Sequence, residues 1–315
     1  MPAVLKLGEI EPEDVPADLR AETYFDFAAH PFAHQALLEQ TKSVYDAILG
    51  INAYATKWLA DTIAAKRAGA RVLIGETPAP AHCIGSFEVM LEDGAFFEPQ
   101  RIIGSTRKGT CYAVYLKQGA KVIGSDIYVD KGSISIGAGT NVEPGVGIKG
   151  PTIIGRDGDI RQGAYLRGDC ILGDDCTIRG EIKNAVMMDK ANFPHPSYVG
   201  DSVCGYMTHF GNQATAANLG IYEGLRDADK RNPLKVTCDG SVYDFGKPKM
   251  GICMGDFSQV GCNAVADPGS FLKPNTIVYA LSRITKGIFY GPNEVLKNKP
   301  FEHGVIERAA LDSLQ

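Results

Sequence analysis

The sequence predicts a mainly β protein organised around a parallel β-helix of hexapeptide repeats, and three observations carry this prediction. First, an aliphatic residue opens every block of six across residues 136–183, at Ile136, Val142, Ile148, Ile154, Ile160, Leu166, Leu172 and Ile178. Second, the fifth place of most blocks is small, as at Thr140, Ala164 and Cys176. Third, a period of six fits neither a helix nor simple strand alternation, so the chain must turn a corner in every block and stack equivalent residues. The aliphatic side chains would fill the interior, and Gly, Asp and Asn would supply the corners.

The rest of the chain is expected to form three regions. Residues 1–100 are expected to be helical and mixed, because the stretch from Pro31 to Arg71 has broad apolar coverage at helical spacing. Residues 101–293 are expected to form the β-helix. Residues 221–249 are polar and of mixed charge. They are expected to leave the β-helix as a loop, because the hexapeptide repeat resumes after them. Residues 294–315 are expected to end in a short amphipathic helix.

Composition limits the classes of partner. The 315-residue chain is 44% hydrophobic and 22% charged, as in soluble globular proteins. Its net charge of −5 lacks the excess of basic residues typical of nucleic-acid-binding proteins, so nucleic acid is not expected as a partner. No apolar run reaches membrane-spanning length and the N-terminus is too acidic for a secretory signal, so we expect no membrane partner and a cytoplasmic location. The eight cysteines lack metal-like pairs, so we expect no metal and buried thiols in a reducing compartment.

His195 is the first candidate for chemistry. It lies between Pro194 and Pro196, in a segment from Phe193 to Tyr198 that is expected to depart from the hexapeptide repeat. Neither proline can donate a ladder hydrogen bond, and a residue before proline is held extended. The imidazole would therefore be presented from a stiff, unpaired bend. From this context alone, an ordinary surface-loop histidine is an equally good interpretation.

The segment PHPSYVGD around His195, with EIKNAVMMD before it and AANLG after it, resembles the acetyltransferase half of bifunctional GlmU-type enzymes. It is still more similar to the related archaeal sugar-1-phosphate nucleotidyltransferase/acetyltransferases, over roughly Val142 to Ala280. This resemblance implies a left-handed β-helix, which is an exception to the right-handed crossover rule. It also implies a homotrimer, in which flat walls pack around a threefold axis and active sites lie between subunits.

The resemblance also implies roles for single residues. The histidine of the family motif P-H-x-x-Y-x-G-D is a general base, which implies this role for His195. The tyrosine of the motif lies beside the sugar and corresponds to Tyr198. Arg167, in AYLRGDC, and Lys183, in EIK, match the family arginine and lysine that contact the sugar phosphate.

Two further groups are implied by the same resemblance. Asn218 matches the asparagine that holds the sugar, and Lys249 is nearest to a lysine that a family loop places close to the substrate. A solvated lysine is an equally good interpretation of Lys249. Gly211, Asn212 and Gln213 stand where the family segment I-G-A-G-T meets acyl-CoA with its backbone, and the segment reads FGNQA here.

The function implied is N-acetylation of an amino sugar phosphate similar to glucosamine-1-phosphate, or of a nucleotide amino sugar, with acetyl-CoA as co-substrate. A mostly protonated amine needs a base, and imidazole titrates near neutrality. Backbone N–H groups near residues 211–213 would meet the tetrahedral oxyanion. No intact nucleotidyltransferase domain is expected. The alternative that stays open is a non-catalytic trimeric β-helix that binds sugar nucleotides or regulates another protein.

Overall fold

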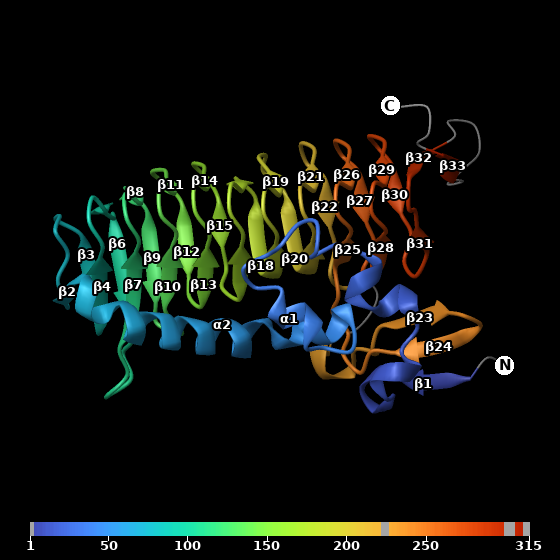
Figure 1. Cartoon of the computed structure of the whole chain (residues 1–315), viewed down its shortest axis with the longest axis horizontal. Coiled ribbons are helices and arrows are strands. Elements are labelled where there is room, and N and C mark those ends of the chain that lie inside the picture. Colours follow the sequence, from blue (N-terminus) through green and yellow to red (C-terminus); the bar gives the residue numbers. More distant parts are fainter. Residues whose placement is uncertain (1–2, 222–226, 299–305, 311–315) are drawn as a thin grey trace. The chain divides into compact units, whose positions relative to one another are not determined.

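The structure is a computed structural model that describes residues 3–221, 227–298 and 306–310. It divides into two compact units. The middle unit is Gly50–Pro196, and the terminal unit is Met1–Leu49 together with Ser197–Gln315. Both units are built from short parallel strands of a β-helix, which confirms the predicted fold class (Figure 1).

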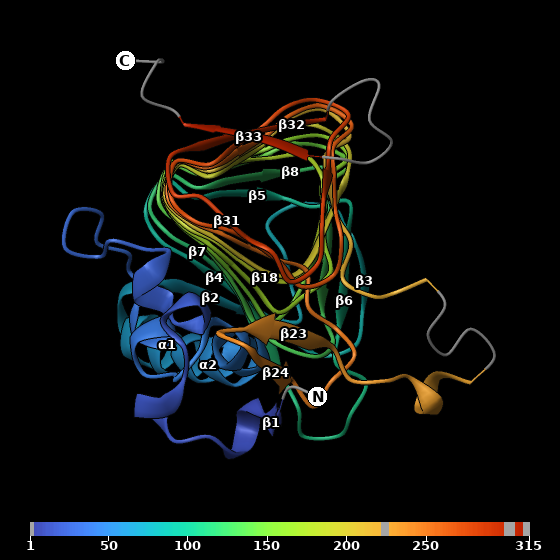
Figure 2. The same cartoon turned by 90° about the vertical axis from the view of Figure 1, so that its right-hand side faces the viewer.

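Strands of the middle unit form three walls, which the end-on view of Figure 2 separates. Wall one contains β3 (His82–Ile84), β6 (Arg101–Gly104), β9 (Asp126–Val129), β12 (Gly147–Lys149), β15 (Tyr165–Leu166) and the start of β18 (Glu181–Met187). Wall two contains β4 (Phe87–Leu91), β7 (Tyr112–Leu116), β10 (Ile134–Ile136), β13 (Thr152–Ile154), β16 (Cys170–Leu172) and the end of β18. Wall three contains β5 (Phe96–Glu98), β8 (Lys121–Ile123), β11 (Asn141–Val142), β14 (Asp159–Ile160), β17 (Thr177–Ile178) and β19 (Asn192–Phe193). The first β-helix strand thus begins at His82, earlier than the expected residue 101.

Successive coils are in register at an interval of 18 residues, which is three hexapeptides. Ile136 pairs with Ile154 on the next coil, and Ile154 pairs with Leu172 on the one after. All three side chains are buried. The aliphatic residue that opens each hexapeptide therefore fills the interior, as the sequence predicted.

One coil of the middle unit is shorter than its neighbours. Ile178 pairs with Phe193, which is 15 residues on instead of 18. Phe193 is fully buried and completes wall three. The prediction that the segment from Phe193 to Tyr198 departs from the repeat is therefore wrong at both ends, because Phe193 ends β19 and Tyr198 begins the next strand.

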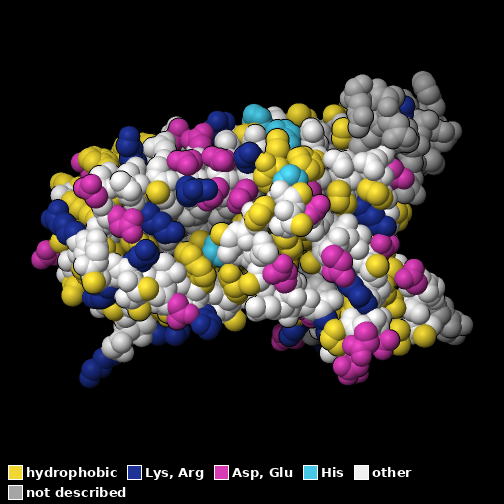
Figure 3. All heavy atoms as spheres, in the orientation of Figure 1, with side chains coloured by type: hydrophobic (Ala, Val, Ile, Leu, Met, Phe, Trp, Pro, Cys, Tyr) yellow, Lys and Arg dark blue, Asp and Glu magenta, His cyan; other side chains and the backbone are white. Residues whose placement is uncertain are grey.

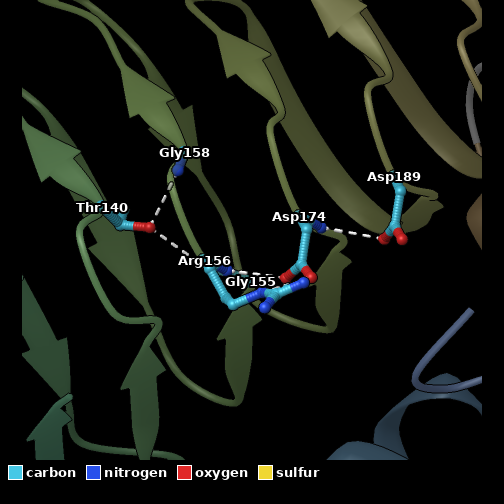
Figure 4. A network of polar contacts seen from close by, with 6 residues as sticks. All are labelled: Thr140, Gly155, Arg156, Gly158, Asp174 and Asp189. Carbon is cyan, nitrogen blue, oxygen red and sulfur yellow. Dashed lines mark hydrogen bonds and ion pairs between the residues drawn. The ribbon is translucent and has the colours of Figure 1, made fainter. Parts of the chain in front are cut away.

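Acidic side chains close the corners between coils, as Figure 4 shows. The Asp174 carboxylate accepts the backbone N–H of Arg156 at 2.7 Å and its Nε at 2.8 Å. The backbone N–H of Asp174 in turn donates to Asp189 at 2.9 Å. Burial raises the pKa of the Asp189 carboxyl. These bonds satisfy corner amides that would otherwise lack a partner.

Helix α2 (Val44–Lys66) crosses from the terminal unit into the middle unit at Gly50, and the helical region predicted between Pro31 and Arg71 is confirmed. In the middle unit α2 lies along the coils (Figure 1), where Asn52 Nδ2 donates to Asp169 Oδ1 at 2.6 Å. The Lys117 ammonium lies 5.5 Å from the centre of the Trp58 ring. A 3₁₀ turn, Arg67–Gly69, then leads into β2 (Arg71–Ile74), which pairs antiparallel with β4. Within the described ranges, no helix is long and apolar enough to cross a membrane.

The strands of the terminal unit also form three walls, which are numbered in the same way. Wall one contains the start of β20 (Tyr198–Cys204), β22 (Thr215–Ala216), β27 (Val265–Ala266) and β30 (Arg283–Ile284). Wall two contains the end of β20, β25 (Ile252–Met254), β28 (Ser270–Leu272) and β31 (Phe289–Tyr290). Wall three contains β21 (His209–Phe210), β26 (Gln259–Val260), β29 (Ile277–Val278) and β32 (Glu294–Asn298).

The insertion at 221–249 contains a hairpin. Its strands β23 (Lys235–Cys238) and β24 (Ser241–Asp244) pair antiparallel, and β1 (Val4–Lys6) joins β24 in parallel. The coils keep their register around the insertion, because Phe210 pairs with Val260, 50 residues on. The remaining helical elements of the unit are α1 (Ala36–Glu39) and the 3₁₀ turns Leu7–Glu9, Pro12–Asp14, Ala17–Leu19, Ala21–Thr23 and Ala228–Lys230.

The expected C-terminal helix is not observed. Ile306–Ala310 forms strand β33, which pairs antiparallel with β32. The physical reason is that β32 ends wall three and presents backbone groups that a returning strand can pair, whereas an isolated helix has no such partner. Residues 299–305 and 311–315 of the expected helix lie outside the described residues.

Candidate functional site

His195 lies at an exposed corner of the middle unit. The bend that carries it is anchored by Phe193, whose ring occupies the space into which a Cβ on Gly180 would project. Pro194 and Pro196 on either side cannot extend the strand ladder. The local sequence therefore presents the imidazole to solvent from a fixed bend, as predicted from the two prolines.

A cavity of about 260 Å³ opens at His195. Its other lining residues are Glu143, Arg161, Gln162, Arg179 and Pro194. Sequence reasoning did not single out the two arginines. Their place in the repeat could have identified them, because each arginine directly follows the aliphatic residue that opens a hexapeptide on wall three.

Charged side chains of both signs line this cavity, since Glu143 lies there with the two arginines. Arg161 Nε lies 2.7 Å from the Asp159 carboxylate. Arg179 Nε donates to the backbone oxygen of Gln162 at 3.2 Å, and Arg179 forms no ion pair with any acidic side chain that the structure describes. The backbone N–H of Gln162 donates to the Glu143 carboxylate at 2.7 Å.

Arg167 and Lys183 come to neighbouring positions on wall one. The backbone N–H of Arg167 donates to the oxygen of Ile182 at 2.8 Å, which places Arg167 next to Lys183 on the following coil. The Arg167 guanidinium lies 2.7 Å from the Glu181 carboxylate. The structure thus brings the two predicted phosphate ligands together, although the described lining of the His195 cavity consists of other residues.

Tyr198, Asn218 and Lys249 belong to the terminal unit, and the first two meet at Gly200. A Cβ on Gly200 would overlap the Tyr198 hydroxyl and lie 3.0 Å from Asn218 Nδ2, so glycine leaves room for both side chains. Asn218 Nδ2 donates to the buried carboxylate of Asp201, the last residue of the motif PHPSYVGD. Met250, the residue after Lys249, donates its backbone N–H to the backbone oxygen of Asn218 at 3.2 Å.

A second cavity, of about 380 Å³, lies in the terminal unit. Its lining includes both chain neighbours of Asn218 and the residue before Lys249. Most of the lining is apolar, as at Leu234 and Val265, and Arg283 supplies a cation that is paired with Asp267 at 2.9 Å. Two of the predicted sugar-binding residues therefore flank one hollow.

The turn at residues 211–213 follows β21 and packs tightly on the next coil. A Cβ on Gly211 would lie 2.6 Å from the backbone nitrogen of Cys262. The Gly211 N–H donates to the Val260 oxygen at 2.7 Å. The strand ladder therefore uses the N–H of Gly211, and the expectation that backbone N–H groups near residues 211–213 meet an oxyanion stays a prediction. Asn212 and Gln213 are exposed.

One face of the molecule carries mixed charge. On the face seen in Figure 3, acidic and basic side chains are interspersed over the coils of the middle unit. This pattern agrees with the net charge of −5 and differs from the basic stripe typical of nucleic-acid-binding proteins.

Known relatives match parts of the chain. Over 170 residues the chain is 34% identical to the uncharacterized acetyltransferase YaiX of Escherichia coli, which covers 51% of this chain and 70% of YaiX. The chain belongs to the hexapeptide-repeat acetyltransferase family. No family model matches it.

Two archaeal members of this acetyltransferase family are also similar. The chain is 30% identical over 111 residues to the bifunctional sugar-1-phosphate nucleotidylyltransferase/acetyltransferase of Sulfurisphaera tokodaii. It is 32% identical over 108 residues to the bifunctional protein GlmU of Methanocaldococcus jannaschii. The matched regions span 26% and 24% of these relatives, about a quarter of their length.

Proposed function

We propose that the protein is an acyl-CoA-dependent N-acetyltransferase that acts on an amino sugar phosphate or a nucleotide amino sugar, with acetyl-CoA as donor. The observation that carries the proposal is the exposed imidazole of His195, held on an anchored bend at a cavity that also contains two arginines. Membership of an acetyltransferase family supports acyl transfer. The names of the archaeal relatives support a sugar phosphate acceptor.

His195 would serve as the base. An amino sugar is mostly protonated at neutral pH, and its nitrogen attacks a carbonyl only after a proton is lost. The ammonium first gives one proton to solvent. The imidazole then takes a second proton from the amine as the nitrogen bonds to the thioester carbon. The carbon–sulfur bond then breaks, and the imidazolium returns the proton to the departing thiolate. The products are the N-acetylated sugar and free thiol.

The remaining predicted residues would orient the two substrates. Tyr198, Asn218 and Lys249 would bind the sugar, with Asn218 held in place by its bond to Asp201. Arg167 and Lys183 would hold the sugar phosphate through charge-assisted hydrogen bonds.

The acyl donor would lie against the exposed turn that contains Asn212 and Gln213. The Gly211 amide contributes to packing of this turn and not to the oxyanion, since its N–H is bonded to Val260.

The test is release of free thiol from acetyl-CoA with a panel of amino sugar phosphates and nucleotide amino sugars. His195→Ala should lower kcat by roughly 10²- to 10⁴-fold with little change in KM, and the wild-type rate should fall at acid pH. Circular dichroism checks that the variant is folded. If the variant acetylates at the wild-type rate, His195 is not the base. If the wild-type protein acetylates none of the panel, the non-catalytic β-helix becomes the better interpretation.

A further inference from the structure

A row of three basic residues crosses wall one of the middle unit. β12 pairs in parallel with β15, and this register makes Lys149 and Arg167 neighbours on successive coils. Lys183 follows Arg167 at the same position on the next coil. The residue before each of the three is buried, so strand alternation places the row on the outer face of the wall. Because neighbouring strands lie about 4.8 Å apart, the row spans about 10 Å.

The row carries more positive charge than the acidic side chains beside it. Like charges at adjacent strand positions normally destabilise a sheet. Glu181 lies 2.7 Å from Arg167, and Asp126, the other acidic residue in the strands of wall one, lies 3.7 Å from Arg101. Neither lysine of the row forms an ion pair with an acidic side chain that the structure describes. An anion bound along the row would therefore relieve the repulsion between its members.

Two tyrosine rings hold Lys149 in position. Its ammonium lies 5.2 Å from the centre of the Tyr128 ring on the coil before and 5.6 Å from the centre of the Tyr165 ring on the coil after. Gly147 leaves room for the second ring, since a Cβ there would lie 3.0 Å from Tyr165 Cδ2. Aromatic faces attract a cation without neutralising it. The ammonium is therefore fixed in place and keeps its charge for an anion.

We propose that Lys149 extends the phosphate site of Arg167 and Lys183 into a diphosphate site, so that the acceptor is a nucleotide amino sugar. This proposal rests on the proposed function and chooses between its two acceptors. Two adjacent cations match a single phosphate, whereas a row of three over about 10 Å matches two phosphoryl groups in succession. The phosphoryl group next to the sugar would bind Arg167 and Lys183, and the group next to the nucleoside would bind Lys149.

The first experiment measures anion binding without catalysis. Inorganic pyrophosphate and inorganic phosphate are each titrated into the full chain in a calorimeter. The wild type should prefer pyrophosphate, because this anion alone reaches all three cations. Lys149→Met should lower the affinity for pyrophosphate about tenfold and leave the affinity for phosphate unchanged, since it removes a charge-assisted bond only at the end of the row. Lys149→Arg keeps the charge and should retain most of the preference.

Lys121→Met is the matched control. Lys121 is an exposed strand lysine of the same unit, but it belongs to β8 on wall three. This variant should bind both anions like the wild type, whereas Lys183→Met should weaken the binding of both. Circular dichroism checks that each variant is folded. The proposal is overturned if Lys149→Met keeps the wild-type preference for pyrophosphate, or if Lys121→Met loses as much of it, which would indicate attraction by overall charge.

Kinetics separate this proposal from the proposed function. In the acetyl-transfer assay, Lys149→Met should raise KM for a nucleotide amino sugar about tenfold and leave KM for an amino sugar monophosphate unchanged. Acetyl transfer to both acceptors with no effect of Lys149→Met would keep the function and reject the diphosphate site. Pyrophosphate binding that depends on Lys149, without acetyl transfer to any acceptor, would keep the site and reject the function.

The same assay distinguishes the acceptor from the acyl donor, because coenzyme A also contains a diphosphate. KM for acetyl-CoA should be the same in Lys149→Met and in the wild type. A rise in KM for acetyl-CoA, with KM for the nucleotide amino sugar unchanged, would assign the row to the donor and overturn the proposal.

Discussion

The ring of Phe193 fills the space into which a side chain on Gly180 would project. This relationship belongs to the shortened coil, and it fixes the bend that carries His195. Gly180→Ala should therefore destabilise the protein by about 1 to 3 kcal/mol, because an added methyl group has no room to shift into. Urea unfolding measures the change.

Gly69→Ala is the control for this prediction. Its added Cβ would meet nothing within 4 Å, so its unfolding midpoint should stay near that of the wild type. Equal midpoints for both alanine variants would contradict the importance of the Phe193 contact.

The Arg67–Glu88 pair should make stability depend on pH. The guanidinium holds both carboxylate oxygens, at 2.7 and 3.0 Å, and its hydrogen bonds lower the pKa of the Glu88 carboxyl. A carboxyl whose pKa is lower in the folded state stabilises the protein when the pH is above the pKa that it has in the unfolded chain. This contribution is lost as the pH falls through the pKa that it has in the folded protein. Glu88→Gln should therefore melt at a lower temperature than the wild type at pH 7, and the difference should shrink below about pH 4. Thermal melts from pH 7 to pH 3 measure it.

Lys57→Gln is the comparison for the pair. Lys57 and Asp61 form an exposed ion pair within helix α2, and such pairs contribute little to stability. A melting difference for Glu88→Gln that stays constant with pH would show that packing, and not charge, is responsible.

Asn218 and Tyr198 should differ in their effects on acetyl transfer. Asn218 is fixed by the Asp201 carboxylate, so Asn218→Ala removes an oriented sugar ligand and should raise KM for the acceptor by about tenfold with a smaller change in kcat. Tyr198→Phe should be milder, since the ring remains in place over Gly200. Steady-state kinetics measure both, and a loss confined to kcat in Asn218→Ala would move this residue into the chemical step.

The eight thiols should fall into two classes. Cys83, Cys111 and Cys262 are exposed, whereas the other five are buried. Desolvation raises the pKa of Cys83 and Cys111, so less reactive thiolate forms at these two residues. The three exposed thiols should react with a thiol reagent before the five buried ones, and mass spectrometry of the labelled peptides identifies the order. Labelling of Cys170, whose pKa burial raises to about 12, before unfolding would contradict the structure.

The assembly expected from the family is a trimer. One chain has a mass of 33.8 kDa, so light scattering at micromolar concentration should give about 100 kDa. A mass near that of a single chain would refute the trimer.

The interior of the β-helix could be predicted because one residue type recurs at a fixed interval, and Ile136 and Ile154 lie where that interval places them. The lining of the cavity at His195 could not. Arg161 and Arg179 are one regular coil apart, but Pro194 joins them only because the next coil is shorter. No local pattern reveals such a deletion, since its compensation is the fit of Phe193 against Gly180.

Pairing between distant segments was also hidden from the sequence. The hairpin at residues 235–244 pairs with Val4–Lys6, more than two hundred residues earlier. The amphipathic spacing after residue 300 favours a helix locally, but the open edge of β32 selects a strand. In both cases a partner far along the chain decides the conformation, and propensity alone does not contain that information.

The returning strand β33 has a consequence for association between molecules. The last coil of a parallel β-helix has unpaired backbone N–H and C=O groups, because each coil presents the same row of these groups to the coil that follows it. A second molecule could add its own coil there, and repetition of that step would grow a fibre. Because β33 pairs antiparallel with β32, it occupies the exposed backbone groups of β32 on wall three and blocks end-to-end growth through them.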